Sequence, residues 1–118
     1  MPNPTVGAAL ANAVADRLQA GRALCFSHPE YCGMGLHCAD GLFIYCEVTD
    51  GELLTQSQYL RRKTDGEAGE FLAFAERDQF VAWLAGQSDL SLSGLDLPQE
   101  WLRANQRLSL ARLRAFLD

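Results

Sequence analysis

Both histidines and three of the four cysteines of this 118-residue chain fall between Ser27 and Glu52. Thiolate sulfur and imidazole nitrogen are the ligands that structural zinc prefers, and such sites usually present them in pairs such as C-x-x-C. No such pair occurs, and Cys25 with His28 only approximates one. We therefore expect buried thiols, with no metal and no cofactor, and keep zinc binding as a minor alternative.

A cysteine nucleophile is the second chemistry that this segment could support. It would need a thiolate activated by a neighbouring histidine, a group that orients the histidine, and oxyanion donors nearby. His28 and Cys32 are close in sequence and glycines follow them, but no signature of a hydrolase family accompanies them. Carboxylates that flank a turn, as in the segment 47–52, are more often solvated than catalytic. We predict that the chain is not an enzyme, and a small Cys/His enzyme remains a lesser alternative.

The charge distribution points instead to a protein partner. The net charge of −5 argues against nucleic-acid binding, which needs Lys and Arg to neutralise phosphates. From Ala23 through Leu60 there is no Lys or Arg, whereas five acidic residues occur there. If these acids share a surface, it would attract a basic protein; the alternative is that they only solvate turns. The predicted partner-binding residues are Glu30, Asp40, Tyr45, Glu47, Asp50 and Glu52.

Aromatic residues are candidate anchors at such a surface, because they supply a large contact area at a low cost in entropy. Of the two rings at Phe43 and Tyr45, we expect Phe43 to lie in the core. Tyr45 is the better anchor, since its hydroxyl can stay in water.

Two Asp-Gly pairs position these residues. Asp40-Gly41 and Asp50-Gly51 lie between apolar or alternating runs, and the two-residue hairpin turn needs φ > 0 at both central positions. We predict a three-stranded meander with strands at 33–39, 42–49 and 52–59. Its register sets Cys38 opposite Phe43, Leu36 opposite Tyr45, and Cys46 opposite Thr55. Met34, Leu36, Cys38, Phe43, Tyr45 and Glu47 would share one face, and His37, Ile44, Cys46, Val48 and Leu53 the other.

Helices are expected on both sides of this meander in the sequence. Asn3 and Pro4 suit the start of a helix that Gly21 ends, and Asp78 and Ser109 suit the caps of later helices. Additional elements are a short strand at 22–27, an exposed loop at 61–70, a strand at 71–75, a loop at 87–98, and a short helix after the capping-box residues Asp96 and Gln99. The order predicts one α+β domain over residues 1–118. It is an antiparallel meander of about four to five strands, with an N-terminal helix and C-terminal helices packed on the sheet.

Targeting signals are not evident in the sequence. No basic segment with an apolar run and a cleavage site follows Met1, and no apolar stretch approaches the roughly 20 residues that span a bilayer. We expect a cytoplasmic protein that contacts no membrane and keeps its cysteines as thiols.

Four segments together resemble a known class of proteins: "SHPEYCGMGL", "GLFIYCEVTDGE", "FLAFAERDQFVAWLAGQSDLSLSG" and "NQRLSLARLRAFL". Their pattern of strands, an aromatic helix and a polar entry to the last helix is similar to the small immunity proteins of bacterial polymorphic-toxin systems, including contact-dependent, Rhs and type VI secreted toxins. The resemblance implies an inhibitor that binds its cognate toxin and has no active site. The alternative is a secretion chaperone or adaptor with another client protein. The sequence leaves the oligomeric state of this protein open.

Overall fold

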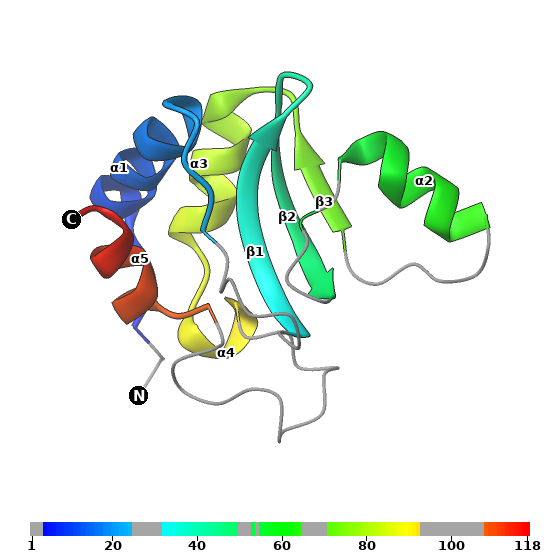
Figure 1. Ribbon diagram of the computed structural model, residues 1–118. Helices are drawn as coiled ribbons and strands as arrows, with labels where there is room; N and C mark the ends of the chain where they lie inside the picture. The colour runs from blue at the N-terminus through cyan, green and yellow to red at the C-terminus, as the bar shows by residue number, and fades with distance from the viewer. Residues whose placement is uncertain (1–3, 25–31, 50–52, 54, 65–70, 93–107) are drawn as a thin grey trace.

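The computed structural model describes residues 4–24, 32–49, 53, 55–64, 71–92 and 108–118. These residues form an α+β fold in which helices pack on one face of a three-stranded antiparallel sheet of order β1-β2-β3 (Figure 1). The elements in chain order are α1 (Ala8–Gln19), β1 (Cys32–Ala39), β2 (Leu42–Thr49), α2 (Gln56–Thr64), β3 (Phe71–Phe74), α3 (Arg77–Ala85), α4 (Asp89–Leu92) and α5 (Leu110–Phe116).

The first predicted hairpin is confirmed. Asp40 and Gly41 have φ values of 55° and 77°, the left-handed conformations that a type I′ turn requires. The register of β1 with β2 pairs Cys38 with Phe43 and Leu36 with Tyr45, as expected. Asp40 is the residue type, after glycine and asparagine, that best tolerates this conformation, so local chemistry determines the turn and the turn determines the register.

The predicted third strand at 52–59 is wrong. The second neighbour of β2 is β3, and Cys46 pairs with Phe71 rather than with Thr55. Residues 56–64 form α2, because Thr55 and Gln58 make a reciprocal capping box. The backbone N–H of Thr55 donates to Gln58 Oε1 at 2.9 Å, and the backbone N–H of Gln58 donates to Thr55 Oγ1 at 3.3 Å. The described residues therefore form three strands, fewer than the four to five that were expected.

Helix α1 begins later than predicted. Its N-cap is Gly7 rather than Asn3, which lies outside the described residues. The backbone N–H groups of Val6 and Gly7 donate to the carbonyls of Gln87 and Ala85 at 2.9 Å each. Because these amides bind the end of α3, the segment before Gly7 is extended and the helix starts only after it.

The remaining predictions for strands and helix caps agree with the structure to different extents. The strand expected at 22–27 is present as a single bridge between Leu24 and Leu36, and residues 25–27 lie outside the described residues. Ser109 caps α5 as predicted, with its Oγ accepting from the N–H of Arg112 at 3.1 Å. Helix α3 starts two residues earlier than predicted, because its N-cap is Glu76 rather than Asp78, which lies in the first turn. The capping box at Asp96 and Gln99 lies outside the described residues.

The core lies between the sheet and the helices α1, α3 and α5, and Phe80 is at its centre. The Phe80 ring stacks on Phe43, with centroids 4.7 Å apart, and packs edge-on against Phe74 at 5.8 Å. The other buried members are Val6, Ala11, Val14, Ala15, Leu18, Leu24, Met34, Leu36, Tyr45, Leu84, Leu92, Leu108, Leu110, Leu113 and Phe116. The expected shared face of Met34, Leu36 and Phe43 is therefore the core face of the hairpin.

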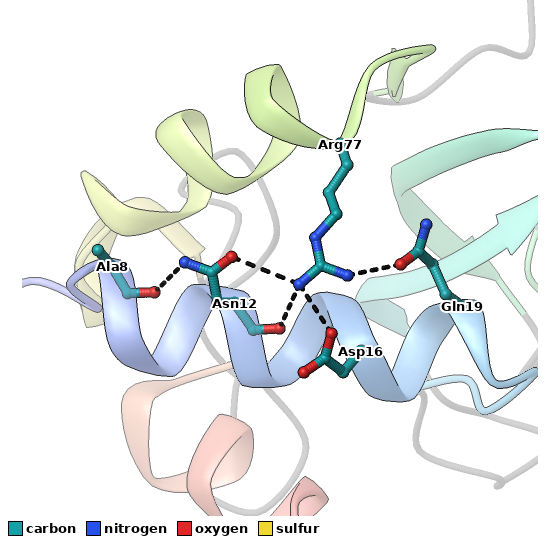
Figure 2. Close-up of polar contacts among 5 residues, drawn as sticks. All are labelled: Ala8, Asn12, Asp16, Gln19 and Arg77. Atoms are coloured by element: carbon teal, nitrogen blue, oxygen red, sulfur yellow. Dashed lines mark hydrogen bonds and ion pairs between the residues drawn. The ribbon is translucent and has the colours of Figure 1, made fainter.

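A polar clamp joins α1 to α3 at the edge of this core (Figure 2). One guanidinium nitrogen of Arg77 lies 2.7 Å from Asp16 Oδ1 and donates to the carbonyl of Asn12 at 3.1 Å. The other nitrogen donates to Gln19 Oε1 at 2.6 Å. Arg77 thus bridges two turns of α1 from the first residue of α3.

Removing this clamp is expected to have a modest effect. Asp16 is 60% exposed, so the ion pair is largely screened by solvent. We expect Arg77→Met to lower the free energy of unfolding by about 1 kcal/mol, and Arg77→Lys to recover only part of it, because an ammonium group cannot reach all three partners as the planar guanidinium does. Urea denaturation of both variants measures this. Full recovery by lysine would show that the fork geometry contributes nothing.

Candidate protein-binding surface

The predicted partner-binding residues do not form one compact patch on the described part of the chain. Asp40 is exposed at the hairpin turn. The backbone of Glu47 lies near the opposite end of β2, where it pairs with Met34. At about 3.3 Å per strand residue, these two acids are roughly 20 Å apart along the hairpin. Glu30, Asp50 and Glu52 lie outside the described residues.

The expectation that Tyr45 presents its hydroxyl to water is wrong. Tyr45 is 2% exposed, and its ring packs against Trp83 of α3 at a centroid distance of 4.9 Å. Its hydroxyl donates to the carbonyls of Leu92 and Ser91, at 3.2 and 3.4 Å. The hydroxyl is hydrogen-bonded inside the protein, at the end of α4, so Tyr45 is a core residue rather than a surface anchor. Phe43 is also in the core, as expected.

Two further acids join Asp40 at the same end of the sheet. Because Phe43 pairs with both Cys38 and Phe74, the turn at Asp40 lies next to the segment that follows β3. Glu76 and Asp78 belong to that segment, and both are exposed. We call Asp40, Glu76 and Asp78 the acidic end. Sequence reasoning missed the last two, because nothing local in the chain indicates that β3 pairs with β2 beside the turn.

The chemistry weighed for the cysteines and His37 can be placed in part. Cys38 lies on the core side of β1, packed at the margin of the core cluster, whereas its neighbour His37 alternates to the other face. No group of three or more His, Cys, Asp or Glu side chains that could hold a metal ion occurs among the described residues. Cys46 is fully buried, as expected for a strand thiol; Cys25, His28 and the side chain of Cys32 are outside the described part.

Burial raises the pKa of the Cys38 thiol, because the thiolate loses its hydration next to apolar side chains. The thiolate is the reactive form, so a raised pKa leaves less of it at neutral pH. We expect Cys38 to react with iodoacetamide more slowly than a free cysteine peptide at pH 7.5, and its rate to rise at a higher pH than that of the peptide. Peptide mapping by mass spectrometry across a pH series measures this. Equal pH profiles would show that the thiol is hydrated.

None of the helices in the described ranges has the length and apolar character needed to cross a bilayer. Comparison with protein-family models, with curated proteins and with solved structures finds no match to this chain.

Proposed function

We propose that this protein is an immunity protein that binds a cognate bacterial toxin and blocks it without catalysis of its own. The observation that carries the proposal is the span 23–60, which holds five acids and no Lys or Arg. Much of this span is the β1–β2 hairpin, whose inner face is anchored in the core by Leu36, Phe43 and Tyr45. Of these acids, Asp40 and Glu47 lie on the hairpin, whose packing fixes the positions of their backbones and suits them to a complementary basic surface.

The acidic end supports the same proposal. Asp40 is exposed, and Glu76 and Asp78 add two exposed carboxylates from α3 and its N-cap. A basic toxin surface would meet several carboxylates of one sign, which raises the rate of encounter and disfavours acidic proteins as partners. Inhibition in this scheme comes from steric occlusion of the toxin, so the inhibitor needs no reactive group.

The test begins with the adjacent open reading frame. A large secreted chain ending in a toxin domain is the expected neighbour, and its toxin domain is co-expressed with this protein or with an empty vector. Survival only in the presence of this protein, together with a stable purified complex, supports immunity. A complex that forms without protecting the cell would instead identify an adaptor or secretion chaperone. A neighbour of metabolic function and no rescue would contradict the proposal.

A further inference from the structure

Helix α2 is unusual in this fold because most of it faces solvent. It extends beyond the β3 edge of the sheet, away from the helices that cover the core (Figure 1). Gln56, Ser57, Gln58, Leu60, Arg61 and Thr64 are all exposed. The Tyr59 ring stacks on Phe71 at 4.3 Å and joins the helix to β3. Helices of nine residues are marginal in water without tertiary packing, so α2 has a face on which further packing would stabilise it.

The exposed part of α2 presents a basic residue beside an apolar one. Leu60 is 53% exposed, and Arg61 beside it is exposed as well. Three of the ten Lys and Arg residues of the chain lie in α2, and none of its 15 Asp and Glu residues does. The complementary surface would be acidic around a small apolar contact.

The acidic end of this same protein has that charge. Helix α2 stacks on Phe71 at one end of β3, whereas Glu76 and Asp78 follow Phe74 at the other end. Strand β3 is an edge strand in the described sheet, and its four residues are apolar and half-buried. A two-fold axis beside β3 would set the edges of two copies antiparallel. Each α2 would then lie next to the acidic end of the other copy.

We propose that this protein forms a two-fold dimer in which α2 of each copy docks at the acidic end of the other. Arg61 of α2 forms a charge pair with Glu76 of the other copy. Leu60 of α2 supplies an apolar contact. The arrangement is closed, since each copy offers both surfaces once and uses both once. The dimer forms without a toxin and does not rest on the proposed function. Because both proposals use the acidic end, a toxin bound there would displace α2 of the other copy.

Sedimentation velocity over a range of protein concentrations and ionic strengths tests the dimer. We expect a monomer–dimer equilibrium that shifts toward monomer as salt is added, because exposed charge pairs are screened. A protein that stays monomeric at low salt up to the highest soluble concentration would overturn the proposal.

Charge reversal tests the geometry. Arg61→Glu and Glu76→Arg should each raise the dimer dissociation constant by about tenfold, since each substitution acts at two contacts and replaces attraction by repulsion. The double variant should restore the dimer, because both contacts regain opposite charges. Arg114→Glu, which makes the same charge change at an exposed position of α5, is the matched control. Circular dichroism verifies that each variant is folded. Single variants that dimerise as tightly as wild type, or a double variant that stays monomeric, would overturn the proposed contact.

Discussion

Phe80→Ala is expected to lower the free energy of unfolding by about 3–5 kcal/mol, the range for deleting a large buried aromatic ring. Phe80 is 0% exposed. Its ring contacts Phe43 of β2 and Phe74 of β3, so it joins α3 to both strands. Alanine at this position leaves a cavity that the paired strands cannot close, because their register holds the flanking rings in place.

Chemical denaturation, followed by circular dichroism, measures this loss. Gln79→Ala is the control, since residue 79 is exposed on the same helix and should stay within about 0.5 kcal/mol of wild type. Trp83→Ala should fall between the two, because the Trp83 ring is only partly buried while it packs on Tyr45 and Phe74. An unchanged midpoint for Phe80→Ala would place the centre of the core elsewhere.

The double reversal Glu47→Lys with Asp50→Lys is expected to slow association with the toxin by about tenfold or more at low ionic strength, and to weaken protection. Steering by complementary charge can raise association rates by about 10–10³-fold, and it fades as salt screens charges over a length of about 8 Å at physiological ionic strength. The rates of wild type and variant should therefore converge as salt increases.

Stopped-flow or biolayer measurements across a salt series give these rates, and survival on toxin co-expression gives protection. Asp118→Lys reverses an exposed acid at the end of α5 and serves as the control for a charge reversal outside the hairpin. Full protection by the folded double variant, with an unchanged rate at low salt, would exclude this part of the hairpin as the contact. The acidic end at Asp40 and Glu76 would then be the next surface to test.

Local chemistry in the sequence accounts for the elements that were predicted correctly. The Asp40-Gly41 turn follows from the φ values that only such residues adopt cheaply, and the β1–β2 register follows from the turn. The Ser109 cap depends on one hydroxyl and one backbone amide three residues later. The capping box of Thr55 and Gln58 was an equally local signal for α2. The alternation of residues after a second Asp-Gly pair suggested a strand there instead.

Tertiary structure alone decided which strand borders β2, where Tyr45 points, and which acids share a surface. The hairpin has apolar residues on both faces, so its sequence does not say which face meets the helices. The burial of Tyr45 beside Trp83 shows which face that is. Pairing of Phe74 with Phe43 places Glu76 at the same end of the sheet as Asp40. These contacts join residues more than 30 positions apart. Their free energy comes from packing between distant elements, which no window of the sequence contains.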